Sequence, residues 1–296
     1  MKINTDILNI KIRDDLWLKP EYLNHKIISG NKLRKLKLNI AKSKTMGYHS
    51  LLTFGGAFSN HIAAVAQVGK DYGFNTIGII RGEELRFKIN ENPTLKFAAS
   101  CGMRLNFVSR ESFRDKSSEA FLQKLKDEFG PFYHLPEGGT NDLAVKGCEE
   151  ILTAKDANFD YICCPVGTGG TIAGLINSSK PHQKILGFPA LKGDFLKTDI
   201  AKFAKKNNWI LVNDYHFGGY AKINMELISF INRFKAEYNI QLDPIYTAKM
   251  MYGVLDMIHN EKFPSDARIL AIHTGGLQGI QGMNMRLQEM NLPLIQ

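Results

Sequence analysis

The sequence predicts an α/β protein in which helices cover both faces of mostly parallel sheets. Short apolar runs alternate with segments of helical periodicity along most of the 296 residues, as expected for parallel strands joined by crossover helices. Glycine-rich loops follow several of the apolar runs. No repeat of fixed period and no low-complexity tract breaks the alternation.

Each element has its own signal in chain order. Leu33, Leu36 and Ile40 have helical spacing. The segment 59–73 begins with cap residues and ends on a glycine, and the segment 92–102 has a proline near its first turn, as helices prefer. The first thirty residues are less regular, and we expect them to pair at a sheet edge. Strands are predicted at 50–54, 76–80, 104–108, 132–135, 161–166, 184–188, 209–212 and 268–274, with further helices at 117–130 and 143–152.

Composition narrows the class of protein. A net charge of +9 attracts anions, but it does not distinguish a phosphate cofactor from an acidic metabolite or a nucleic acid. Aromatic residues are not interleaved with the lysines as in base-stacking modules, so we expect no nucleic-acid partner. No apolar run of about 18 residues predicts a membrane span, and no spacing of ligand residues predicts a metal site.

The cysteines and the N-terminal segment bear on the compartment. Cys163 and Cys164 lie in an apolar run that predicts a buried strand, where thiols stay reduced and inert. The N-terminal segment mixes charges with its apolar residues and resembles no secretory signal. We therefore expect a cytoplasmic protein.

Three loops at predicted strand ends are candidates for ligand binding, because ligands of parallel α/β proteins collect at the carboxyl ends of the strands. The loop at 54–61 combines two glycines with Ser59 and Asn60 at a helix N-terminus, which favours an anion. The loop at 166–171, VGTGGT, offers backbone N–H groups and hydroxyls to a phosphate without being a Walker motif. The loop at 273–279 follows the last strand. Each loop can also be an ordinary turn.

The stretch SGNKLRKLK, residues 29–37, places cations at a predicted helix start. Turn or cap residues, Ser29 among them, precede Lys32, Arg34 and Lys35. Cations there oppose the helix dipole, so a nearby anion would explain them better than a solvated basic helix does. A lysine in desolvated or cationic surroundings has a lowered pKa and attacks aldehydes. A lysine, a phosphate loop and aromatic residues together indicate pyridoxal 5'-phosphate.

The motifs resemble a known family at this point. SGNKLRKLK, GGAFSNH, PEGGTND, VGTGGTIAG, LDPIYTAKM and IHTGGLQG occur in the order found in the 1-aminocyclopropane-1-carboxylate deaminase and D-cysteine desulfhydrase family. The resemblance runs from about residue 28 to residue 280. It implies the pyridoxal-phosphate fold type II, similar to the tryptophan synthase β subunit, with two open twisted sheets and the cofactor between them.

The resemblance also implies roles for individual residues. Lys32 would hold the cofactor as a Schiff base, and Lys35 would help to bind its phosphate. Asn60 would hydrogen-bond the ring oxygen of the cofactor, while Ser59 would meet the substrate carboxylate or take part in proton transfer. The phosphate loop would consist of Gly167, Thr168, Gly169, Gly170 and Thr171.

Two tyrosines and a threonine complete the implied site. Tyr246 would stack on the cofactor ring or act near the substrate, and Tyr220 matches a second active-site tyrosine in a less similar motif. In deaminases of the family a glutamate follows the first tyrosine and pairs with the pyridine nitrogen, whereas this chain has Thr247. A neutral hydroxyl makes a weaker electron sink, which suits β-elimination of a good leaving group better than ring opening.

The resulting interpretation is a lyase or deaminase that acts on a small amino acid. D-Cysteine, giving pyruvate, ammonia and sulfide, is the preferred substrate, and 1-aminocyclopropane-1-carboxylate is the alternative. A dehydratase or β-replacement enzyme of the same fold, or a non-catalytic anion- or nucleotide-binding protein, are further alternatives. The expected domains are a small one at 41–145 and a large one from 1–40 and 146–296, in a chain that forms a homodimer.

Overall fold

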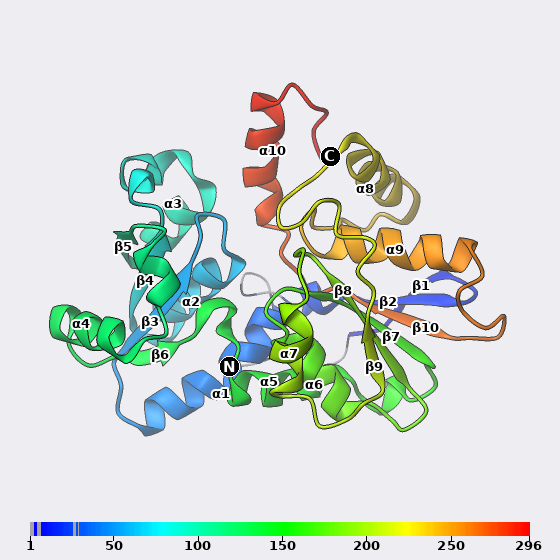
Figure 1. Ribbon diagram of the computed structural model, residues 1–296, viewed down its shortest axis with the longest axis horizontal. Coiled ribbons are helices and arrows are strands. Elements are labelled where there is room, and N and C mark those ends of the chain that lie inside the picture. The colour runs from blue at the N-terminus through cyan, green and yellow to red at the C-terminus, as the bar shows by residue number, and fades with distance from the viewer. Residues whose placement is uncertain (1–2, 5–6, 26–27, 29) are drawn as a thin grey trace.

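The computed structural model describes residues 3–4, 7–25, 28 and 30–296. Within these residues the chain forms two separate sheets, each flanked by helices (Figure 1). The predicted fold class, with two open and mostly parallel sheets, is therefore confirmed. The prediction that Ser29 is a turn or cap residue lies outside the described residues.

The larger sheet holds the segments from both ends of the chain. Its strands are β1 (Ile10–Arg13), β2 (Leu16–Lys19), β7 (Tyr161–Val166), β8 (Lys184–Pro189), β9 (Trp209–Leu211) and β10 (Ile269–Ile272). Their order is β1-β2-β10-β7-β8-β9, and only the β1–β2 pair is antiparallel among the described strands. The expectation that the N-terminal segment pairs at a sheet edge is confirmed, because β1 is an edge strand.

The smaller sheet is entirely parallel in the described part of the chain. Its strands are β3 (Ser50–Gly55), β4 (Asn75–Arg81), β5 (Arg104–Val108) and β6 (Tyr133–Leu135), in the order β5-β4-β3-β6. All four strands lie at predicted positions. They fall within the segment 41–145, whose role as a domain remains a prediction.

Helices connect the strands and cover the sheets. The α-helices are α1 (Asn31–Thr45), α2 (Asn60–Tyr72), α3 (Pro93–Ser100), α4 (Glu119–Phe129), α5 (Asp142–Cys148), α6 (Gly170–Ser178), α7 (Phe195–Ala201), α8 (Met225–Tyr238), α9 (Thr247–His259) and α10 (Gly279–Glu289). The short 3-10 helices are η1 (Glu21–Leu23), η2 (Glu83–Glu91), η3 (Ser112–Asp115), η4 (Glu137–Gly139), η5 (Glu149–Ile151) and η6 (Ala154–Asp156). The side-chain oxygens of Ser59, Asn92 and Ser118 cap α2, α3 and α4, as their sequences predict.

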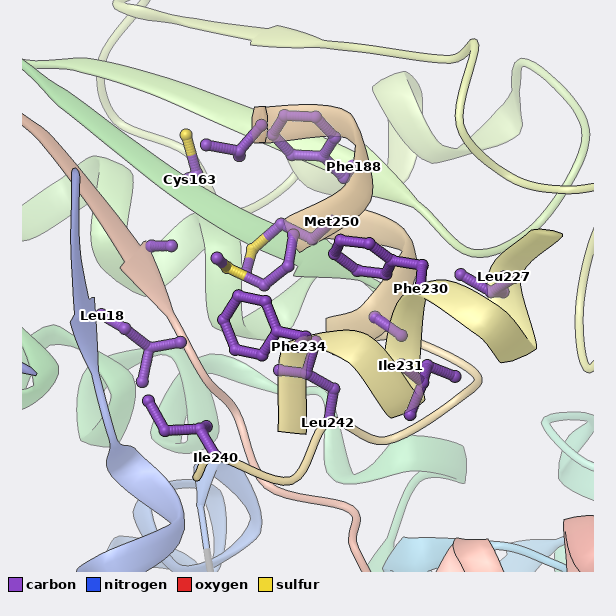
Figure 2. Close-up of a cluster of buried hydrophobic side chains, with 14 of the residues drawn as sticks. Leu18, Cys163, Phe188, Leu227, Phe230, Ile231, Phe234, Ile240, Leu242 and Met250 are labelled. Carbon is purple, nitrogen blue, oxygen red and sulfur yellow. The ribbon is translucent and has the colours of Figure 1, made fainter. Parts of the chain in front are cut away.

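The large sheet has an apolar core on each face. Successive residues of a strand point to opposite faces, so in β7 Cys163 joins one cluster while Ile162 and Cys164 join the other. The first cluster includes Phe230 and Phe234 of α8, which lie near Met250 of α9 (Figure 2). Both cysteines are free and fully buried, and burial raises the pKa of each thiol. They serve as core residues.

Helix α1 belongs to the packing of the small sheet. Leu33, Leu36 and Ile40 are buried in one cluster with Leu51 of β3 and Leu135 of β6. The boundary predicted between residues 40 and 41 thus falls inside a continuous helix. No helix in the described part of the chain is long and apolar enough to cross a membrane.

The aromatic packing between α8 and α9 should dominate the stability of the large-sheet core. Phe234 is 2% exposed, and replacing it with alanine leaves a cavity, so Phe234→Ala should destabilise the protein by about 3–5 kcal/mol. Phe87 is 86% exposed, and Phe87→Ala should change stability by less than about 0.5 kcal/mol. Urea unfolding of both variants measures the difference. Equal unfolding midpoints would contradict the packing described.

Candidate active site

A pocket between the two sheets collects residues from distant parts of the sequence. Helix α1 contributes its first turn, α2 its N-terminus, and η4 one glycine. The loop after β7 and the segment after β10 form the facing wall. The carboxyl ends of both parallel sheets therefore meet at one site, as parallel α/β proteins require.

Nearly all predicted site residues line this pocket. They are Lys32, Lys35, Ser59, Asn60, Gly167, Thr168, Gly169, Thr171, Tyr220 and Tyr246. Gly170 and Thr247 do not line it. Gly170 stands just behind the wall, since a Cβ there would lie 3.2 Å from Nζ of Lys35. Thr247 is completely buried beneath Tyr246 at the start of α9.

The basic stretch divides into two kinds of cation. Arg34 is buried and donates two hydrogen bonds, of 2.9 and 3.0 Å, to the carboxylate of Glu21. Lys37 pairs with Glu150 at 2.7 Å. Lys32 and Lys35 have no carboxylate within ion-pair distance among the described residues, and both face the pocket. The two cations without a carboxylate partner are thus Lys32 and Lys35, which the family resemblance assigns to the cofactor.

The amine of Lys32 is tuned for reaction at neutral pH. Burial, and then the positive charge of Lys35, lower the pKa of Lys32 to about 7. About half of the amine is then uncharged at pH 7, whereas an ordinary lysine is almost fully protonated. Its Nζ donates a hydrogen bond of 3.1 Å to Oδ1 of Asn31, whose amide donates one of 2.8 Å to Oγ1 of Thr171.

Lys35 ties the glycine loop to the small-sheet side of the pocket. Its buried ammonium donates to the carbonyl of Gly138 and to Oγ1 of Thr140, each at 3.0 Å. Oγ1 of Thr168 lies 3.4 Å from Nζ of Lys35 and 2.6 Å from Oγ1 of Thr140. Burial lowers the pKa of Lys35. Uncompensated positive charge therefore stands directly beside the loop.

The loop itself is shaped as an anion cradle. Gly169 has a φ of +80°, a conformation that side-chain-bearing residues rarely adopt. Gly170 leaves no room for a Cβ, which would stand 2.8 Å from Oγ1 of Thr140. Helix α6 begins at Gly170 with no side-chain cap, so its first N–H groups and its dipole are available to an anion.

The N-terminus of α2 forms the opposite wall. Oγ of Ser59 accepts a hydrogen bond of 3.3 Å from the Ile62 N–H, and Asn60 and His61 follow it into the pocket. His61 is 1% exposed, and neither of its ring nitrogens has a hydrogen-bond partner among the described residues. Burial, together with the charges of Lys32 and Lys35, holds the pKa of His61 well below its ordinary value. The imidazole at this wall of the pocket therefore has hydrogen-bonding capacity that no described residue uses.

Two tyrosines close the pocket on the large-sheet side. The rings of Tyr220 and Tyr246 are 6.1 Å apart and meet edge to face. Desolvation raises the pKa of both phenols, and the neighbouring Tyr220 raises that of Tyr246 further. Both are therefore protonated at neutral pH and serve as hydrogen-bond donors.

Thr247 lies behind Tyr246 and is engaged with Asp243. Its hydroxyl donates to Oδ2 of Asp243 and accepts from the Asp243 N–H, each at 2.9 Å. The Asp243 carboxylate also accepts hydrogen bonds from the N–H groups of Ile245, Tyr246 and Thr247. Asp243 thus caps α9 and positions Tyr246.

Motif reading missed several residues of the pocket. The sequence predicts Asn31 only as one of the turn or cap residues before Lys32, whereas in the structure its side chain joins Lys32 to Thr171. Thr140, which bonds both Lys35 and Thr168, lay in the quoted PEGGTND motif without a role. The unpartnered state of His61 depends on η4 packing against its ring, and no local pattern could reveal it.

Known proteins resemble the chain over almost its whole length. A profile of the family described as pyridoxal-phosphate dependent enzyme matches residues 4–275. A Thermotoga maritima protein provisionally named 1-aminocyclopropane-1-carboxylate deaminase is 31% identical, over 95% of this chain and 94% of its own. The mitochondrial bifunctional D-cysteine desulfhydrase/1-aminocyclopropane-1-carboxylate deaminase of Arabidopsis thaliana is 30% identical, over 90% and 73%. The crystal structure of an ACC deaminase homologue matches with a TM-score of 0.80 at 26% identity, over 93% and 88%.

The fold and the pocket define a pyridoxal-phosphate-dependent enzyme of fold type II. Within that class, the chain belongs to the 1-aminocyclopropane-1-carboxylate deaminase and D-cysteine desulfhydrase family. The pocket fits the cofactor, because it offers an amine of lowered pKa for the aldehyde and a glycine cradle for the phosphate. The predictions of the family, of an enzyme and of the cofactor are confirmed.

The lowered pKa of Lys32 predicts how the apoprotein captures its cofactor. The reactive amine forms as pH rises, so the capture rate should increase through pH 7 and level off about one to two units above the pKa of about 7. Stopped-flow absorbance after mixing apoprotein with pyridoxal phosphate measures this profile, with Lys32→Ala as the control. A rate that keeps climbing to pH 10, as for an ordinary lysine, would contradict the desolvated setting.

Proposed function

We propose that the protein is a lyase that converts D-cysteine and water into pyruvate, ammonia and hydrogen sulfide. The observation that carries the proposal is the position of the Lys32 amine, which lines the same pocket as the glycine-loop residues Gly167, Thr168, Gly169 and Thr171. The choice of substrate rests on Thr247, a neutral residue where deaminases of the family carry a glutamate.

The residues around the pocket are assigned by their chemistry. Lys32 would hold the cofactor, and Asn60, as the family resemblance implies, would hydrogen-bond its ring oxygen. Bound pyridoxal phosphate supplies an electron sink for the charge that develops at the substrate Cα. The phosphate site is made of Lys35 and the loop residues Gly167, Thr168, Gly169, Gly170 and Thr171. Support for this site comes from the Lys35 ammonium, which has only neutral oxygen partners among the described residues.

Side chains of the pocket transfer protons and bind the substrate. Nζ of Lys32, with a pKa of about 7, can take a proton from the substrate Cα and return it later. Ser59 binds the substrate carboxylate at the N-terminus of α2, where the dipole favours an anion. Tyr220 and Tyr246 are protonated at neutral pH, so their hydroxyls can donate to a departing thiolate.

The environment of Thr247 favours elimination. Its hydroxyl proton is already donated to Asp243, and its oxygen already accepts the Asp243 N–H. Such a hydroxyl offers no negative charge of its own to a protonated ring nitrogen, so the electron sink is weaker than beside a glutamate. Expulsion of thiolate tolerates this better than opening of a cyclopropane ring. The names of the relatives keep 1-aminocyclopropane-1-carboxylate as the second candidate.

Substitution of Lys32 tests the assignment of the cofactor lysine. The purified wild-type protein should be yellow, and borohydride should bleach it and fix the cofactor to the peptide that contains Lys32. Lys32→Ala should abolish both the chromophore and the modified peptide. The matched control is Lys37→Ala, which removes another lysine of helix α1, one that pairs with Glu150. This variant should retain the chromophore and the modified peptide. A yellow Lys32→Ala protein would refute the assignment.

A substrate panel tests the reaction. With D-cysteine the wild-type enzyme should release pyruvate and sulfide in equal amounts, at a kcat/KM at least about tenfold above that for 1-aminocyclopropane-1-carboxylate, a difference of about 1.4 kcal/mol in transition-state stabilisation. L-Cysteine and D-serine report on enantiomer and leaving group. Release of 2-oxobutanoate from 1-aminocyclopropane-1-carboxylate at the higher kcat/KM would overturn the proposal in favour of ring opening.

A further inference from the structure

The loop that carries Tyr220 has an unusual backbone. It joins β9 to α8, and Phe217, Gly218, Gly219 and Ala221 all have φ between +52° and +115°. Phe217 and Ala221 are not glycines, so this conformation is strained and persists only where the surroundings hold it. Tyr220 is 43% exposed, so the packing of its own side chain does not stabilise the strained backbone.

A buried lysine contacts the loop immediately before Tyr220. Nζ of Lys249, on α9, donates hydrogen bonds of 2.8 and 2.7 Å to the carbonyls of His216 and Gly219. Lys249 is 1% exposed and has no carboxylate within ion-pair distance among the described residues. Burial lowers its pKa to about 8. A methionine would fill the space without this desolvation cost. The hydrogen bonds that Lys249 donates to the two carbonyls are therefore the reason for a lysine at this position.

An arginine contacts the loop immediately after Tyr220. Nη1 of Arg286, on α10, donates a hydrogen bond of 2.9 Å to the carbonyl of Ala221. The carbonyls on either side of Tyr220 are therefore held by cations from two different helices.

We propose that Lys249 and Arg286 form a clasp that positions the hydroxyl of Tyr220 in the pocket, and that neither residue touches the substrate. The inference rests on the proposed function in one respect, the use of Tyr220 in the reaction. Lys249 and Arg286 are thus positioning residues, and loss of either should let the strained loop relax. A misplacement of about 1 Å can cost up to about 100-fold in rate.

The clasp is tested first without substrate. Hydrogen exchange followed by mass spectrometry should show faster exchange in the segment 216–222 of Lys249→Met and Arg286→Met than of wild type. Lys222→Met is the matched control, because Lys222 is exposed in the same loop and its side chain forms no hydrogen bond or ion pair with any described residue. Its exchange should equal that of wild type. Unchanged exchange in both clasp variants would overturn the proposal, whatever the reaction catalysed.

Kinetics then separate positioning from general stability. Lys249→Met should lower kcat at least about tenfold, with a smaller change in KM and unchanged cofactor absorbance. In the Tyr220→Phe background the same substitution should lower kcat less than about twofold, because the group that it positions is gone. An equal loss in both backgrounds would overturn the proposal.

Substitution of Arg286 provides an independent test of the clasp if Lys249→Met does not fold. Arg286→Met should show the same dependence on Tyr220, and Arg286→Lys, which retains a donor, should restore more than half of the activity. Failure of the lysine to restore it would contradict the clasp. A wild-type protein without a cofactor chromophore would instead refute the proposed function, while the exchange result would still decide whether the clasp exists.

Discussion

Two ammonium groups without a neutralising carboxylate among the described residues are the constraint on which this site depends. Lys32 and Lys35 stand one helical turn apart, and both face the pocket. Holding two positive charges out of water costs free energy, which a bound anion offsets by attraction to both. Arg34 and Lys37 of the same helix differ from these two lysines, because they have carboxylate partners and do not line the pocket.

The chain builds this setting by bringing two distant segments to the start of α1. The Asn31 N–H donates to the carbonyl of Thr274 at 3.0 Å, and a Cβ on Gly30 would lie only 1.9 Å from that oxygen. The Asn31 amide bonds Thr171 at the start of α6. Because only glycine allows this approach, α1 begins against the segment that follows β10. The reactive lysine, one residue further on, is placed by backbone contacts of the large-sheet side.

Local patterns predicted most of the fold and the three loops that line the pocket, for a physical reason, while the roles of individual residues came from the family resemblance. Strands such as β7 carry continuous apolar runs because both faces of a parallel sheet are buried, and loops after such strands must gather at one edge. What depends on contacts between distant residues was not predictable. The bidentate pair of Arg34 with Glu21, the Thr140–Thr168 contact and the unpartnered ring of His61 arise only after folding. The domain boundary predicted after residue 40 lies within α1, which packs against the small sheet, and the division into domains stays a prediction.

Asp243 shows how an acid near the pocket can leave the lysine reactive. Its negative charge raises the pKa of Lys32, yet burial and Lys35 outweigh it and the pKa falls to about 7. The carboxylate of Asp243 accepts hydrogen bonds from three backbone N–H groups and from the Thr247 hydroxyl. Hydrogen bonds of this kind stabilise the ionised acid where it stands. The acid therefore fixes Tyr246 and Thr247 in place while the amine keeps the low proton affinity that attack on an aldehyde requires.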